Sequence, residues 1–188
     1  MAGGGQIEVD DAGATNVDCG VADVNNTDQI LVTGAGTIVI NLSGGPFAPG
    51  EEVEGTGTSE IEFGVAVGID VTIEGSSAAD NIVIGETTTG TLTTNINLNG
   101  DNDTDLTADA TAVVTVFGMG GDDVVSANGG TGTGDPEQDG VSLFGGDGLF
   151  DGGVEADTLT GGDGPDLIEG EEGPDILNGA DGDRKSVV

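Results

Sequence analysis

The chain has 188 residues, of which 36 are Asp or Glu and only two are Lys or Arg, so its formal net charge at pH 7 is -34. It contains no His, Trp or Tyr, which excludes Ser-His-Asp and Cys-His catalytic groups and HExxH zinc sites. Because binding to phosphate backbones or anionic lipid depends on Lys and Arg, we expect neither nucleic acid partners nor direct membrane insertion.

This excess of carboxylates has two physical explanations. The carboxylates are solvated, as in salt-adapted proteins, or they are neutralised by bound cations. An even distribution along the chain indicates solvation, whereas a fixed period beside glycine indicates metal ligands. The spacing of the acidic residues therefore decides between the two.

Short β-branched runs bounded by Gly, Asn and Asp predict β-strands in the first 117 residues. Between Val65 and Ile73, apolar residues alternate strictly with other residues, which predicts one continuous strand with an apolar face. With 38 glycines spread along the chain, helices are expected to be absent or trivial. The other runs are Ile30–Val32, Ile38–Ile40, Ile82–Ile84 and Val113–Phe117.

The acidic segment 101–105 (DNDTD) resembles the start of an EF-hand loop. Position six of such a loop is Leu106 here rather than Gly, and position twelve is Ala112 rather than Glu. The sharp turn and the bidentate ligand of an EF-hand are therefore missing. The segment is either a looser cation site or a solvated loop.

The composition changes after about residue 117. Residues 1–117 hold most of the β-branched runs and are predicted to form an irregular parallel β-helix-like region. Residues 118–183 consist of short Gly/Asp units, with the polar stretch 129–140 predicted as a loop. We treat these as two regions of one elongated structure.

A nine-residue repeat runs through residues 152–183 as GGVEADTLT, GGDGPDLIE, GEEGPDILN and the partial unit GADGD. Each full unit has Asp at position six and Leu or Ile at position eight, and an earlier copy over 118–126 has Asp and Val there. The position-six residues are Asp123, Asp157, Asp166 and Asp175. This regular period of Asp beside glycine favours metal ligands over solvated charge.

The residue types of the repeat suit calcium, which binds about six to eight oxygen atoms from carboxylates and backbone carbonyls. Glycine at positions one, two and four permits positive φ and directs carbonyls to a common point, where a Cβ would clash. Asp at position six supplies charge, and position eight begins a very short strand with an inward side chain. Each unit is therefore half of an 18-residue coil.

These residues resemble the glycine-rich nonapeptide repeat of RTX, or haemolysin-type calcium-binding, proteins. The resemblance implies an all-β fold, a right-handed parallel β-helix or β-roll solenoid of short strands and Gly/Asp turns, with Ca²⁺ held between stacked turns. It also implies that Asp157 and Asp175 share one site, while Asp166 lies on the opposite edge. The candidate metal ligands are Asp123, Gly152, Gly153, Glu155, Asp157, Gly161, Gly162, Asp163, Gly164, Asp166, Gly170, Glu171, Gly173 and Asp175.

We expect a calcium-binding, non-enzymatic segment of a larger secreted or cell-surface protein that folds on Ca²⁺ outside the cell, with further domains of the parent chain missing. Type I secretion is what the resemblance implies for its export. Residues 184–188 hold both basic residues and break the repeat, so we predict a non-native tail there. Two alternatives stay open: a β-helical polysaccharide-active enzyme fragment, and a salt-adapted acidic adhesin or stalk that binds calcium incidentally.

Overall fold

The computed structural model describes residues 6–11, 14–23, 25–45, 47, 60–130, 132–146, 155–181 and 186–187. The regular elements in these residues are all β-strands, which confirms the predicted class, and none is a helix long and apolar enough to cross a membrane. In chain order the strands are β1 (Gln6–Asp11), β2 (Ala14–Asp23), β3 (Gln29–Val32), β4 (Gly36–Asn41), β5 (Glu62–Val65), β6 (Ile69–Glu74), β7 (Asn81–Thr87), β8 (Thr93–Asn97), β9 (Leu106–Asp109), β10 (Val114–Phe117), β11 (Val124–Ser126), β12 (Val141–Phe144), β13 (Thr158–Thr160), β14 (Leu167–Glu169), β15 (Ile176–Asn178) and β16 (Ser186–Val187).

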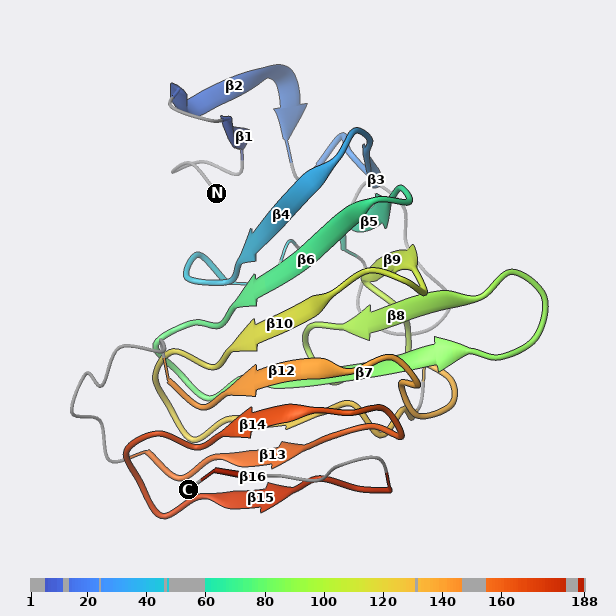
Figure 1. The fold of residues 1–188 in the computed structure, drawn as a ribbon. Coiled ribbons are helices and arrows are strands. Elements are labelled where there is room, and N and C mark those ends of the chain that lie inside the picture. The colour runs from blue at the N-terminus through green and yellow to red at the C-terminus, as the bar shows by residue number, and fades with distance from the viewer. Residues whose placement is uncertain are drawn as a thin grey trace.

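Most of these strands form two sheets, whose strands are stacked one above another in Figure 1. Within the described residues, one sheet has six strands in the order β16-β14-β12-β10-β6-β4, and the other has eight in the order β15-β13-β11-β7-β8-β9-β5-β3. Neighbouring strands are parallel except for β7, β8 and β9, which pair antiparallel. The hairpin β1–β2 forms a separate antiparallel pair.

Consecutive strands at the C-terminal end alternate between the two sheets: β13 and β15 lie in the eight-stranded sheet, and β14 and β16 in the six-stranded one. Thr158 pairs with Ile176, and the carboxylate ladder described below advances by the same 18 residues, the length of two nonapeptides. Toward the N-terminus, successive carboxylates of the ladder are farther apart in the sequence: 34 residues from Asp123 to Asp157 and 43 from Asp80 to Asp123. Longer segments are inserted between the paired strands there. Parallel pairing also continues across residue 117, since β10 pairs with β6 and β12.

The core lies between the two sheets and is built from one inward side chain per short strand. As predicted, the position-eight residues face inward: Val125 and Leu159 are fully buried in a row with Ile82, and Ile168 is buried in the opposite sheet. Leu177, in β15, is partly buried and packs against the same core. Residues at positions seven and nine consequently point outward.

Leu159 and Leu167 test this pattern with the same chemical change. Leu159 is 0% exposed, whereas Leu167 at position seven is 40% exposed. We expect Leu159→Ala to lower the free energy of unfolding by about 2–5 kcal/mol, because it leaves a cavity, and Leu167→Ala to lower it by less than about 1 kcal/mol. Urea denaturation in the presence of Ca²⁺ measures both values, and equal losses would contradict the assignment of the two faces.

The single strand predicted between Val65 and Ile73 is wrong. Strand β5 ends at Val65 and β6 begins at Ile69, and the chain passes from one sheet to the other between them. Gly68 makes this turn with a φ of 86°, which glycine adopts without steric cost, and Val67 is left 69% exposed. The alternation is unbroken in the sequence only because each strand places an inward residue, Val65 or Ile69, beside the turn.

Candidate metal-binding sites

Four acidic side chains converge beside the turn that joins β8 to β9. They belong to Glu60, Asp101, Asp103 and Asp105, and each offers a carboxylate oxygen within 4.8 Å of the others. Glu60 and Asp105 are buried, and the other two are partly buried. A metal ion could bind here, because clustered carboxylate oxygens are the ligands that hard cations prefer.

Asparagine side chains shape this turn. Asn97 Oδ1 accepts hydrogen bonds from the N–H groups of Asn99 and Gly100, at 3.1 and 2.6 Å, and Asn99 Oδ1 accepts one from Asp101 at 2.9 Å. Such bonds from Asn to the backbone two or three residues on stabilise turns. Asn99 Nδ2 also donates to both carboxylate oxygens of Glu60, at 2.8 and 2.9 Å. The turn thereby holds an acidic residue that is 39 positions away in the sequence.

The pKa of Glu60 is raised to about 9 in this environment. Burial of the carboxyl is the main cause, followed by the hydrogen bond and the like charge of Asp105, while the Asn99 amide partly offsets them. At neutral pH Glu60 therefore holds a proton unless a cation takes its place. The 101–105 segment therefore belongs to an acidic group that could bind a cation.

A second set of carboxylates forms a ladder at the edge where the chain turns from the six-stranded to the eight-stranded sheet. The Asp80 N–H donates to Asp123 Oδ1 at 2.8 Å, and the Asp123 N–H donates to Asp157 Oδ1 at 2.8 Å. The Asp157 N–H in turn donates to Asp175 Oδ1 at 3.0 Å. The structure therefore places Asp157 and Asp175 on one edge, in directly stacked turns.

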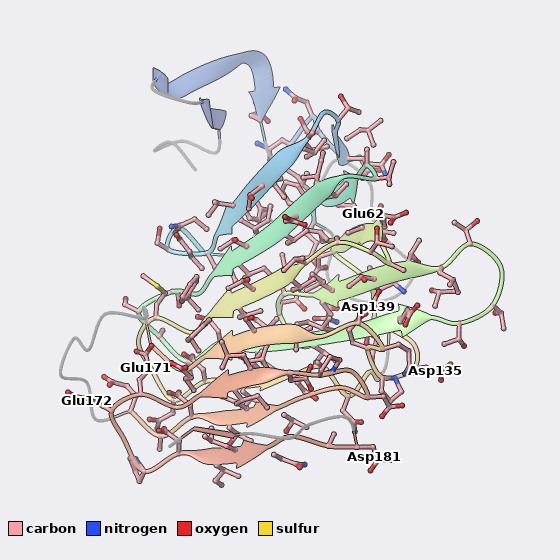
Figure 2. The ribbon with its side chains drawn as sticks, viewed as in Figure 1. Glu62, Asp135, Asp139, Glu171, Glu172 and Asp181 are labelled. Carbon is pink, nitrogen blue, oxygen red and sulfur yellow. The ribbon has the colours of Figure 1, made fainter. Side chains whose placement is uncertain are left out.

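Several candidate ligands line one hollow at this edge, where Figure 2 shows Glu171 and Glu172. The Gly173 backbone packs so tightly against the Glu155 carbonyl that a Cβ there would lie 1.8 Å from the oxygen. Gly152 and Gly153 lie outside the described residues. The residues that line the hollow are Met119, Gly145, Gly146, Glu155, Asp157, Gly170, Glu171 and Glu172.

Three units have a residue other than glycine at position two of the repeat, and in each of them this residue has left-handed backbone. Among the described residues, the non-glycine residues with positive φ are Met119, Glu171 and Ala180, at 74°, 67° and 50°, and each occupies position two of its unit. Left-handed backbone costs little for glycine and more for other residues. Glycine occupies this position at Gly146 and Gly162, and neither has a positive φ. A Cβ on Gly162 would lie 2.4 Å from the Glu137 carbonyl oxygen, so close packing rather than φ requires glycine there.

Burial makes the ladder carboxylates hard to ionise. It raises the pKa of Asp123 to about 7; the hydrogen bond from Asp80 opposes this, and the charge of Asp157 adds to it. Burial also raises the pKa of Asp157, with smaller contributions from the charges of Asp175 and Glu155. Asp123 Oδ2 is buried without a hydrogen-bond partner among the described residues. These carboxylates would be stabilised in their charged form by a cation.

Asp166 lies at the opposite edge, at the start of a strand of the six-stranded sheet. Its Oδ2 accepts a hydrogen bond from Gly162 within its own turn at 2.9 Å, and its Oδ1 accepts one from Val141 at 3.0 Å. The turn 161–164 packs on the Glu137 carbonyl, which accepts from Asp163 and Gly164 at 2.8 and 3.2 Å. In the described chain this turn thus stacks on a non-repeat segment, and it lacks a cluster like that of Glu60.

Comparison with models of known protein families, with curated proteins and with solved structures finds no match to this chain. What the protein does is therefore inferred from its own residues and their geometry.

Proposed function

We propose that this chain is a calcium-binding, repeat-built structural segment of a larger secreted or cell-surface protein, and that Ca²⁺ outside the cell folds it. Its role is structural rather than enzymatic, and calcium ions are its partners. Its short strands form a parallel β-roll in which ions bridge successive turns, as the likeness to RTX repeats implies.

One observation carries the proposal: four carboxylates, those of Glu60, Asp101, Asp103 and Asp105, are held within 4.8 Å of one another. Like charges at this distance repel, and no Lys or Arg precedes residue 184 to offset them. A cation with several oxygen ligands removes the repulsion and satisfies the carboxylates together.

The position-six ladder supports the same function in the repeat region. Its hydrogen bonds join Asp157 to Asp175 across 18 residues, which is the spacing of turns in a roll built from paired nonapeptides. Glu155, Asp157 and Glu171 line one hollow between these turns. Calcium suits such a site better than magnesium, because Mg²⁺ requires near-ideal octahedral geometry and gives up water reluctantly.

Two substitutions test the site beside β8 and β9. We expect Asp105→Asn to weaken calcium binding at this site by about tenfold or more, since it removes a buried charge from the ligand set. We expect Glu60→Gln to lower the number of protons released on binding near neutral pH by about one per chain, because the raised pKa keeps Glu60 protonated in calcium-free protein. Isothermal titration calorimetry in two buffers of different ionisation enthalpy measures the affinity and the released protons.

Asp181→Asn is the matched control, because Asp181 is exposed and Figure 2 shows it far from the turn between β8 and β9. It removes the same unit charge and should leave both quantities unchanged. If Asp105→Asn and Glu60→Gln reproduce the wild-type titration, the four carboxylates do not bind calcium.

A further inference from the structure

Four buried side-chain oxygen atoms outside the two acidic groups lack hydrogen-bond partners within the part of the chain that the structure describes. They are Glu86 Oε2, Glu137 Oε2, Thr94 Oγ1 and Thr133 Oγ1, and the first three belong to side chains that meet at one place. Glu86 is 5% exposed, Glu137 is 1% exposed and Thr94 is fully buried. Burying a polar group without a partner lowers the stability of the fold unless a hydrogen bond or a bound ion compensates.

The three side chains meet on the inner face of the eight-stranded sheet. Glu86 follows Ile82 and Ile84 along the buried face of β7, and Thr94 lies directly opposite Glu86 on the antiparallel strand β8. Residues paired in this way have side chains on the same face and in reach of each other.

Glu137 reaches the same place from the 129–140 loop. Glu86 and Asp135 exchange backbone hydrogen bonds of 2.8 and 3.0 Å, which fixes the loop against the end of β7 two residues before Glu137. Burial raises the pKa of Glu137 to about 7, the charge of Glu86 adds to this, and the Thr94 hydroxyl lowers it. The Glu137 carboxyl therefore lies close enough to Glu86 and Thr94 to interact with both side chains.

We propose that Glu86, Glu137 and Thr94 form an internal cation site, and that it holds one Ca²⁺ between the sheets. This site is separate from the turns and from the Glu60 group, so it does not depend on calcium binding there. Two carboxylates balance the charge of a divalent ion, and the hydroxyl is a further oxygen ligand. A proton shared by the two carboxyl groups is the alternative, and it would leave the calcium content the same in the wild type and in the Gln variants.

The test counts tightly bound calcium in the full chain after weakly held ions are removed on a chelating resin, with elemental analysis as the readout. Glu86→Gln and Glu137→Gln should each retain one Ca²⁺ fewer per chain than the wild type. Both substitutions keep the shape of the side chain. The amide that they introduce can donate a hydrogen bond to the remaining carboxylate, so the core can still form. Asp139→Asn is the control. Asp139 is exposed and its charge acts on Glu137, but it is not one of the three proposed ligands.

Thr94→Val keeps both carboxylates and the volume of the side chain, so it covers the case in which a Gln variant does not fold. We expect it to release the retained ion faster than the wild type in radiocalcium exchange. Unchanged calcium content in the folded Gln variants, or unchanged exchange in Thr94→Val, would overturn the proposal and favour a shared proton.

Discussion

Removing calcium from the full chain with excess chelator should unfold residues 118–181. We expect most of the β-sheet circular dichroism of this region, and the protection of β11 to β15 against hydrogen exchange, to disappear and to return when Ca²⁺ is restored. The reason is that Asp123 and Asp157 are buried next to other carboxylates, which disfavours their charged forms unless a cation balances them. Hydrogen exchange measured by mass spectrometry locates the loss within the intact protein.

Mg²⁺ should substitute poorly for Ca²⁺ in this experiment, because it resists exchanging water for a mixed carboxylate and carbonyl site.

Protonation of the ladder carboxylates should replace bound Ca²⁺ in part. The native pKa of Asp123, about 7, lies above its unfolded value, so its contribution to stability in chelator is full below about pH 4 and is lost as the pH rises through 7. Recovery of the fold in molar KCl with chelator at pH 8 would instead support the salt-adapted alternative.

The strands around β3 to β6 should lose less protection than the repeat region. Strands β5 and β6 each bury two or more apolar side chains, such as Phe63 and Val65 in β5, and depend less on the Gly/Asp turns. The turn 98–105 is the exception, because it belongs to the Glu60 group. It should lose protection together with the C-terminal coils.

The regular part of the fold could be predicted from the sequence because it depends on local spacing. A β-strand alternates its side chains, so Leu159 and Ile168 at position eight had to lie on one face, and both are buried. The nine-residue period likewise assigns Asp157 and Asp175 to one edge and Asp166 to the other, as the hydrogen bonds of the ladder and of Val141 show.

The interactions that the sequence did not reveal depend on contacts between distant segments. Nothing near Glu60 indicates that it meets the 101–105 segment, because Asn99 makes that connection across 39 residues. Glu137 lies in a polar stretch that reads as a solvated loop, yet its carboxyl is buried against β7 and β8. A carboxylate within an apolar alternation, as Glu86 is after Ile82 and Ile84, was the one available signal.

Loss of charge from the Asp157 and Asp175 pair should have the second large effect. Replacement by Asn suits this ladder better than replacement by Ala, because Asn Oδ1 can still accept the backbone hydrogen bond that each Asp accepts. Each single variant should raise the calcium midpoint of folding by about tenfold or more. The double variant should cost little more than the worse single one, because a shared site is lost only once.

A calcium titration of folding, followed by circular dichroism, compares these three variants with Asp166→Asn and with the controls Asp181→Asn and Glu169→Gln. The controls remove the same charge away from position six, from the exposed Asp181 and the partly buried Glu169. They should leave the midpoint almost unmoved, since charges outside the site are screened over about 8–10 Å. The shift of the midpoint in Asp166→Asn should lie between that of the controls and that of the Asp157 and Asp175 variants. The turn before Asp166 stacks on residues 137–141 rather than on an earlier repeat. Calcium bridging stacked turns predicts large, non-additive shifts for Asp157 and Asp175; equal shifts for all single variants would show that calcium responds only to diffuse charge.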